Sequence, residues 1–362
     1  MRWGSFFGGR KGNFGTDMRP AIVTLPGPVA EVGTSNSTQY ALLADGSLFA
    51  WGLGTQGQLG DGTTRNSFST PVRVRFPSGV KIASIPTDAM PYDTGLAVDT
   101  EGRVWGWGDN GGGELCTASR RAYRVPVLLP LSQVTAVAGA SNHALYDAAG
   151  TVYACGQNVE GDLGDGSRRS STVPVKVAGL GGGRVSELVA SFANSGALLS
   201  SGKYFDWGYD AHGELGDGYP DLSSDVPVRV PLPHPVKQVA QGGSLWDNGQ
   251  TLVILKGGAL WAWGDDWAGQ LGNGGGSGMQ EPSPVRFRSP AGVTYRSLAT
   301  GSATSYALST TGAVYAWGAS HVGQVGDGLT GTARTPALVT LSATSISSTA
   351  NNVVINTPDK DP

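Results

Sequence analysis

Residues 51–62 read WGLGTQGQLGDG, with five glycines in twelve positions. Glycine at this density can form a loop that cradles phosphate. A P-loop, however, also needs a Gly-Lys-Ser/Thr ending, and a dinucleotide site needs GxGxxG between a strand and a helix. This stretch has neither. It recurs instead along the whole chain, and a motif repeated in this way is a building element and not a single nucleotide site.

Two short signatures define the repeat. The first is a Trp-Gly pair that begins at residues 3, 51, 107, 207, 263 and 317, and Cys155-Gly156 fills the same phase. The second follows each pair and reads GNFG at 12–15, GQLG at 57–60, GELC at 113–116, GDLG at 161–164, GELG at 213–216, GQLG at 269–272 and GQVG at 323–326. The spacing of 48–56 residues predicts a solenoid, a propeller or an array.

The sequence inside each copy predicts strands. The segment YALLADGSLFAWG at 40–52 has two apolar runs separated by Asp-Gly, which is a strong hairpin signal. A proline-led run follows, such as PVRVRF at 71–76 or PVKV at 174–177, and proline is tolerated at the start of a strand. A shorter apolar segment such as VTAVAGA then precedes the next hairpin. About four strands per repeat is the size of a propeller blade.

The two chain ends predict closure of a ring. Arg2 and Trp3 lie in the last strand of a hairpin whose first strand is missing, and NNVVINTPDKDP at 351–362 resembles that missing strand and its turn. Pairing of strands from opposite termini removes an exposed sheet edge. We therefore expect residues 1–362 to form a single all-β domain, closed by N- and C-terminal strands within one blade.

The two signatures resemble the regulator of chromosome condensation repeat family, and the resemblance covers essentially the whole chain. It implies a seven-bladed β-propeller of four-stranded blades, and it implies protein binding, which is what such propellers do as exchange factors, receptors, ubiquitin-ligase modules and inhibitors. The sequence departs from the pattern at Cys155, in place of tryptophan, and at Cys116, in place of glycine. Because arginine is frequent and lysine rare, we expect a bacterial-type member.

Composition excludes several other classes. The chain of 362 residues has 57 glycines, 15% charged residues and a formal charge of −3 without a basic run, so we expect no nucleic-acid partner. No apolar stretch approaches the roughly 20 residues of a membrane span, and no signal-type region follows Met1, which leaves secretion or a cytoplasmic location open. The two cysteines match no metal-ligand spacing, so we expect buried free thiols, no metal and no cofactor.

Two tryptophans stand outside the repeat phase and point to a binding face. Trp246 lies in the segment before the hairpin at 251–263 and Trp267 in the segment after it, so both are expected at one end of the propeller, opposite the hairpin turn. Tryptophan in a surface loop is typical of binding hot spots. The same loops of all repeats supply the predicted partner-binding residues Phe6, Phe7, Tyr92, Asp109, Tyr209, Asp210, His212, Trp246, Asp265, Asp266, Trp267 and His321.

The sequence therefore predicts a monomeric, non-enzymatic propeller that binds a protein through aromatic and acidic loops on one face. An alternative stays open: an enzyme or small-ligand binder that uses the mouth of the central channel, with His212, His321 and nearby aspartates. Histidines from different blades converge only near that channel, as a metal or acid–base centre would require. His143, in the segment SNHAL, is expected to be structural.

Overall fold

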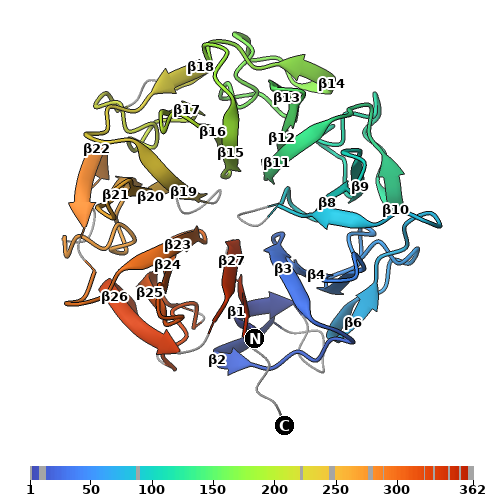
Figure 1. The fold of residues 1–362 in the computed structure, drawn as a ribbon, viewed down its shortest axis with the longest axis horizontal. Coiled ribbons are helices and arrows are strands. Elements are labelled where there is room, and N and C mark those ends of the chain that lie inside the picture. Colours follow the sequence, from blue (N-terminus) through green and yellow to red (C-terminus); the bar gives the residue numbers. More distant parts are fainter. Residues whose placement is uncertain are drawn as a thin grey trace.

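The structure is a computed structural model, and it describes residues 2–7, 14–86, 90–220, 223–243, 249–275, 280–287, 289–321, 323–328, 331–340, 343–349 and 352–357. The regular elements within these ranges are all β-strands. They form seven four-stranded antiparallel sheets that stand like blades around a central axis (Figure 1). In the same ranges there is no helix of the length and apolarity needed to cross a membrane.

Six blades are each built from one continuous segment, with the innermost strand first. Their strands are β3 (Val29–Thr34), β4 (Thr38–Leu43), β5 (Leu48–Gly52) and β6 (Ser67–Arg73); β7 (Ile82–Ser84), β8 (Thr94–Asp99), β9 (Val104–Gly108) and β10 (Tyr123–Leu128); β11 (Val134–Ala140), β12 (His143–Ala148), β13 (Thr151–Gly156) and β14 (Ser171–Lys176); β15 (Val185–Ala190), β16 (Asn194–Leu199), β17 (Tyr204–Gly208) and β18 (Ser224–Arg229); β19 (Val236–Gly242), β20 (Gln250–Leu255), β21 (Leu260–Asp265) and β22 (Gln280–Phe287); and β23 (Tyr295–Thr300), β24 (Thr304–Ser309), β25 (Val314–Ala319) and β26 (Thr332–Thr340).

The remaining blade is composed of strands from both ends of the chain. It contains β1 (Arg2–Phe7), β2 (Phe14–Ala21), β27 (Ser345–Thr349) and β28 (Asn352–Asn356), in the order β2-β1-β28-β27. Trp3 pairs with Val353, and Arg2 pairs with Val354, in antiparallel register. The predicted pairing of the two termini is therefore present, and it closes the ring next to β3 and β23.

The blade boundaries differ from the grouping suggested by the sequence. The short apolar segment that follows a proline-led strand, such as β11, pairs with the hairpin downstream of it, from Val134–Ala148 to Ala140–His143. It is therefore the innermost strand of the next blade and not the last strand of its own repeat. The cause is burial, because this segment lines the ring centre, where β11 contacts the inner strand β15 of the neighbouring blade.

Burial within a blade is greatest in the second strand from the axis and lowest in the outermost strand. Every residue of β4, β8, β12, β16, β20 and β24 is buried, whereas the outermost strands β14 and β18 alternate between half-buried and exposed positions. Prolines such as Pro174 and Pro227 lie within these outer strands. Because proline has no amide hydrogen, it makes an exposed edge a poor template for pairing with another chain.

The Trp-Gly and GxLG signatures meet at the boundary between neighbouring blades. Trp107 donates its Nε1 hydrogen to the carbonyl oxygen of Gln58 in the preceding blade, at 2.9 Å. A methyl group on Gly60 would lie 2.9 Å from the same indole, so only glycine fits under the ring. The equivalent contacts are Trp207 with Gly164, Trp263 with Gly216 and Trp317 with Gly272. The glycines of the repeat thus hold adjacent blades together.

The expectation of free thiols is wrong. Cys116 and Cys155 form a disulfide, and both side chains are buried. They lie on different blades, 39 residues apart in sequence and 5.5 Å apart between Cα atoms. These are the glycine and tryptophan positions of one blade boundary, so the two departures from the repeat pattern form a single cross-link.

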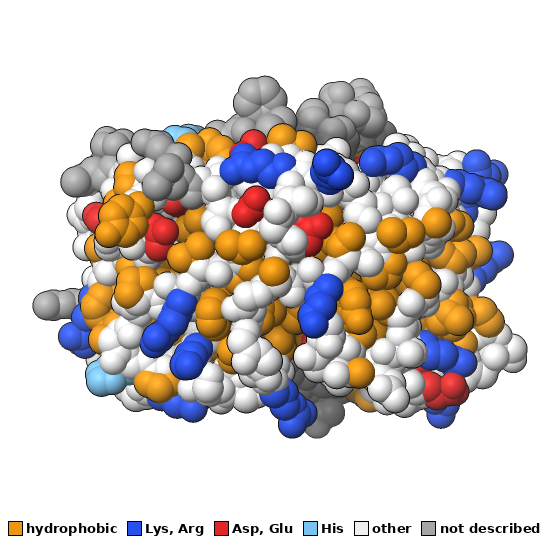
Figure 2. All heavy atoms as spheres, turned by 90° about the horizontal axis from the view of Figure 1, so that it is seen from above, with side chains coloured by type: hydrophobic (Ala, Val, Ile, Leu, Met, Phe, Trp, Pro, Cys, Tyr) orange, Lys and Arg blue, Asp and Glu red, His pale blue; other side chains and the backbone are white. Residues whose placement is uncertain are grey.

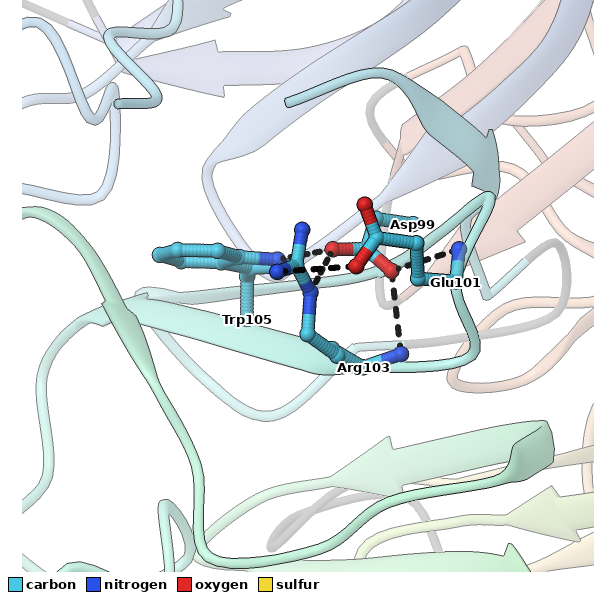
Figure 3. A network of polar contacts seen from close by, with 4 residues as sticks. All are labelled: Asp99, Glu101, Arg103 and Trp105. Atoms are coloured by element: carbon cyan, nitrogen blue, oxygen red, sulfur yellow. Dashed lines mark hydrogen bonds and ion pairs between the residues drawn. The ribbon is translucent and has the colours of Figure 1, made fainter. Parts of the chain in front are cut away.

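A network of polar side chains stabilises the turn between β8 and β9 in the blade β7–β10 (Figure 3). Asp99 Oδ2 accepts hydrogen bonds from Arg103 Nε at 2.7 Å and from Trp105 Nε1 at 2.9 Å, and Arg103 also pairs with Glu101. Burial opposes ionisation of Asp99, but the hydrogen bonds from Trp105 and Arg103 prevail and hold its pKa below the usual value. Trp105 therefore serves the fold, as its place in the repeat suggests.

Candidate interaction face

The loops before and after each central hairpin lie together at one end of the ring, which we call the loop face. In the blade β3–β6, Leu53 N donates to Ser37 O across the base of the hairpin at 2.9 Å. Gly52 has a φ of 122°, and a methyl group there would lie 2.3 Å from Ser37 O, so glycine permits this close approach. The second half of each Trp-Gly pair thus holds the two loops of a blade side by side.

In five blades the third residue after the Trp-Gly or Cys-Gly position caps the following turn. Asp266 Oδ1 accepts a hydrogen bond from Leu271 N at 2.9 Å, and Asp210 Oδ1 accepts one from Leu215 N at 2.9 Å. Asn110 and Asn158 make the same bond in other blades. Asp210 and Asp266 are fully buried, so the structure places these two predicted binding residues inside the blade. Burial raises the pKa of Asp266 to about 6.

Trp267 and His321 form a stacked pair from the loops of neighbouring blades. Their ring centroids are 5.8 Å apart and the planes differ by 8°. Trp267 is half-buried and packs on a small cluster that contains Ala268, Ala303 and Ala319, whereas His321 is exposed. The stack gives the indole a fixed orientation on the loop face, which lowers the entropy cost of further contacts.

A second pair of rings lies on the neighbouring blade. Tyr209 and His212 are both half-buried, with centroids 6.3 Å apart. His212 N donates to Glu214 Oε2 at 2.8 Å, and His212 Nδ1 lies 3.6 Å from Glu214 Oε1. Burial raises the pKa of Glu214 to about 7. The predicted residues Tyr209 and His212 therefore belong to one ordered loop.

The mouth of the central channel carries a third pair. Tyr92 lies 6.4 Å from Phe192, measured between ring centroids, and both are half-buried. They line a shallow hollow together with Met90, which lies in the same segment as Tyr92, and with Gln241 and Thr300 from two other blades. Met90 and Gln241 were not among the predicted site residues. Gln241 lies near the end of the inner strand β19, and its Nε2 donates to the carboxylate of Asp206 in the neighbouring blade.

The remaining predicted residues make contacts only within their own loop, are buried, lie in β1 or lie outside the described residues. Asp109 Oδ1 accepts a hydrogen bond from Gly111 N at 3.2 Å within its own turn, and Asp265 is buried. Phe6 and Phe7 are the last two residues of strand β1, and Trp246 lies outside the described residues.

The histidines do not come together at the channel. His212 pairs with Glu214 in its own loop, whereas His321 stacks on Trp267. His143 is buried, its Nε2 lies 3.0 Å from Ser195 Oγ, and burial lowers its pKa to about 4. Across the described part of the chain, no three His, Cys, Asp or Glu side chains are placed to hold a metal ion. The geometry is that of a rigid ring with ordered aromatic loops at one end.

Comparisons with known proteins identify the class to which this ring belongs. Models of the regulator of chromosome condensation (RCC1) repeat match residues 45–86, 101–146, 149–193 and 295–324. The protein is thus a propeller built from RCC1 repeats. The chain belongs to the RCC1 repeat family.

Relatives with curated names share modest identity. The human E3 ubiquitin-protein ligase HERC2 is 27% identical over 86% of this chain, and the Ultraviolet-B receptor UVR8 of Arabidopsis thaliana is 26% identical over 78%. The matched region is 5% of HERC2 and 62% of UVR8, less than two thirds of either relative. These relatives come from animals and plants, so the expected bacterial character has no support.

Solved structures show the same fold at low identity. Human WBSCR16 has a TM-score of 0.82 and 17% identity, and the match covers 99% of this chain and 98% of that one. Prp20p from Saccharomyces cerevisiae has a TM-score of 0.79 and 21% identity, covering 92% and 83%. The likeness extends over the whole ring, and it concerns the fold alone.

Proposed function

We propose that this protein is a non-enzymatic, monomeric propeller that binds a partner protein through the loop face. The observation that carries this proposal is the Trp267–His321 stack, in which an indole is oriented by its blade and remains partly accessible. Tryptophan contributes disproportionately to binding energy when it is held rigidly at an interface. Tyr209 and the Tyr92–Phe192 pair extend the same aromatic character toward the channel.

The family supports a binding role. The structure of yeast Prp20p was reported together with its binding properties to Gsp1p and histones, and the same protein, yeast RCC1, has been solved with Kap60. That yeast propeller therefore engages proteins. We infer the same general role for this chain.

The test compares capture by wild-type protein and by a Tyr209→Ala/Trp267→Ala variant. Each is immobilised and exposed to native extract, and bound proteins are identified by mass spectrometry. The control is Tyr219→Ala, because Tyr219 is 67% exposed but lies at the outer rim, where Gly218 N donates to Pro282 O of the next outer strand. Thermal melts verify that all three proteins fold.

We expect one protein to be captured by wild type and by the control and to be lost from the double variant. Removal of two aromatic anchors should weaken its binding by about 2 kcal/mol or more. Equal capture by all three proteins would place the interface elsewhere. The channel alternative is not favoured by any arrangement of the described histidines.

A further inference from the structure

A groove lies at the outer rim of the loop face, between the blades β3–β6 and β7–β10. It has a volume of about 620 Å³. One wall comes from the loop that follows β5, and the other from the start of the outer strand β10. The residues used below are Thr55, Gln56 and Thr64 on the first wall and Arg121, Tyr123 and Arg124 on the second. We call this feature the arginine groove.

The walls of the groove are fixed by backbone contacts between the two blades. Gly62 N donates to Arg124 O at 2.9 Å. A methyl group on Gly57 would lie 2.8 Å from Arg124 Cα, so the chains touch directly at the floor. Tyr123 is half-buried and packs against the core of its own blade. The groove is therefore preformed, which reduces the entropy cost of binding.

The two arginines of the groove are exposed and unpaired among the residues that the structure describes. Arg121 and Arg124 are exposed, and in the described part of the chain neither guanidinium makes a hydrogen bond or lies within ion-pair distance of a carboxylate. Arg75 adds a third charge, because a methyl group on Gly62 would touch both Arg75 Nη1, at 3.7 Å, and Val125 Cγ1, at 3.6 Å. Lys and Arg side chains are also more frequent than acidic ones on the side wall of the ring that carries β14 and β18, which faces the viewer in Figure 2.

The blade β11–β14 carries a different set of charges at the equivalent positions. Gln56 follows the repeat tryptophan by five residues, and the equivalent residue after Cys155 is Glu160. Glu160 Oε2 lies 3.6 Å from Nη1 of Arg168, which takes the place of Thr64, so that loop carries a negative charge as well as a positive one. The arginine groove has the neutral Gln56 instead. Its positive charge is thus left available in a protein whose formal charge is −3.

We propose that the arginine groove binds an acidic, extended peptide segment of a protein partner. Guanidinium groups recognise carboxylates through paired, charge-assisted hydrogen bonds. The hydroxyl groups of Thr55 and Thr64 and the amide of Gln56 can bond the peptide backbone on the opposite wall. This proposal rests on the proposed function, since it names the chemistry of part of the partner, and it adds a contact at the rim to the aromatic contacts nearer the axis.

A peptide fits the groove better than a nucleic acid does. The two arginines of the groove lie at one blade boundary, whereas a nucleic-acid backbone requires charge along its length. The aromatic residue of the groove, Tyr123, is half-buried in its blade and offers no open ring for base stacking. Polar groups on one wall and arginines on the other suit an extended chain with acidic side chains.

The experiment measures fluorescence anisotropy of a labelled synthetic peptide in which glutamate alternates with serine. Wild-type protein is compared with Arg121→Glu/Arg124→Glu. The matched control is Arg184→Glu/Arg229→Glu, which makes the same charge change at two exposed arginines outside the groove. Competitors are inorganic phosphate and a single-stranded oligonucleotide, and a peptide of alternating lysine and serine tests the sign of the charge.

We expect the groove variant to bind the glutamate peptide at least about 10-fold more weakly, and the control to bind within a factor of about two of wild type. Binding should weaken with added salt. Equal loss in both variants, absence of binding at low salt, or stronger competition by phosphate or oligonucleotide would overturn the proposal. The Tyr209→Ala/Trp267→Ala variant should bind the glutamate peptide as wild type does. Loss of partner capture in that variant and loss of peptide binding in the groove variant are therefore independent outcomes.

Discussion

Cys116 and Cys155 occupy the places that a glycine and a tryptophan take at other blade boundaries. Cys116 has a φ of 55°, close to the 63° of Gly164, which lies under the indole of Trp207. A tryptophan at 155 would meet a side chain at 116, and a glycine at 116 would leave a gap beside a cysteine. The disulfide and the indole that covers a glycine are therefore two alternative ways to fill the space between adjacent blades.

The two substitutions should be strongly coupled. We expect Cys155→Trp alone to destabilise the fold by about 1–3 kcal/mol more than the double variant Cys116→Gly/Cys155→Trp, because only the double variant makes room for the indole. At another boundary the carbonyl oxygen of Gln58 accepts hydrogen bonds from both Tyr40 and Trp107. The equivalent carbonyl oxygen of Glu114 accepts one from Tyr146, so it can accept a second from the new indole. Urea unfolding of the four proteins of the cycle measures the coupling. Additive effects would contradict the proposed equivalence.

Reduction of the disulfide should lower thermal stability. The cross-link joins residues 39 apart, and closing a loop of that size stabilises a fold by about 2–4 kcal/mol. Because both cysteines are buried, reduction requires local opening and should be slow in the folded state. Melting curves with and without reductant test this. The variant Cys116→Ala/Cys155→Ala should melt at one temperature in both conditions, and a shift there would assign the reductant effect to another cause.

Glu214→Gln should stabilise the protein at neutral and higher pH. Burial raises the pKa of Glu214 from 4.5 to about 7, so the folded state retains a proton that the unfolded state loses. The resulting penalty is absent below pH 4.5, grows up to about pH 7 and is constant above it. Glutamine can accept the same backbone bond, as Gln270 does from Ala268 N at 2.9 Å.

The expected gain of the Glu214→Gln variant is up to about 3 kcal/mol at about pH 8 and near zero at about pH 4. Unfolding by urea at both pH values measures it. Glu101→Gln is the control, because the Glu101 side chain is 66% exposed, and it should change stability little at either pH. A gain that does not depend on pH would show that ionisation of Glu214 is not its source.

Gly164→Ala should destabilise the fold more than Gly181→Ala. Both glycines have positive φ, 63° and 68°, so both substitutions bring the same backbone strain. A methyl group at 164 would lie 2.6 Å from Trp207 Nε1, whereas at 181 it would meet nothing within 4 Å. We expect a difference of about 1–3 kcal/mol in the free energy of unfolding. Equal losses would mean that the indole contact does not restrict this position.

Asp266→Asn should leave partner capture intact and stabilise the blade by about 1 kcal/mol at neutral pH. The equivalent Asn110 caps its turn and also donates Nδ2 to Ser119 O at 2.8 Å, a bond that a carboxylate cannot make. Capture and melting temperature are measured on the same samples. If the variant lost capture of the partner protein but kept a normal melting temperature, Asp266 would have to contact the partner directly.

Much of the fold could be predicted because its determinants are local and repeated. Strand patterns, Asp-Gly turns and the Trp-Gly spacing are visible in the sequence, and pairing of the termini followed from the incomplete hairpin at Trp3. The disulfide could not be read in the same way. Its cysteines lie in different repeats, and only the contact between an indole and the preceding glycine shows that these positions adjoin.

The candidate site was less predictable for a similar reason. Loop residues look exposed in a sequence, but Asp210 and Asp266 satisfy backbone amides inside their turns. A signal existed, since Asp, Asn or Ser recurs three residues after the repeat tryptophan, which is typical of a capping position. The arginine groove had no such signal, because Gln56 and Arg121 come from different blades.

The composite blade also sets an order of events during synthesis. A ribosome makes β1 and β2 first, and their partners β27 and β28 emerge only after every other blade has been completed. Until then the nascent chain exposes the edge of β1 that later receives β28, with three residue pairs from Arg2–Val354 to Gly4–Asn352. An unpaired edge invites association with other chains. The edge of β1 therefore waits longest for its partner and needs protection until the last blade has been synthesised.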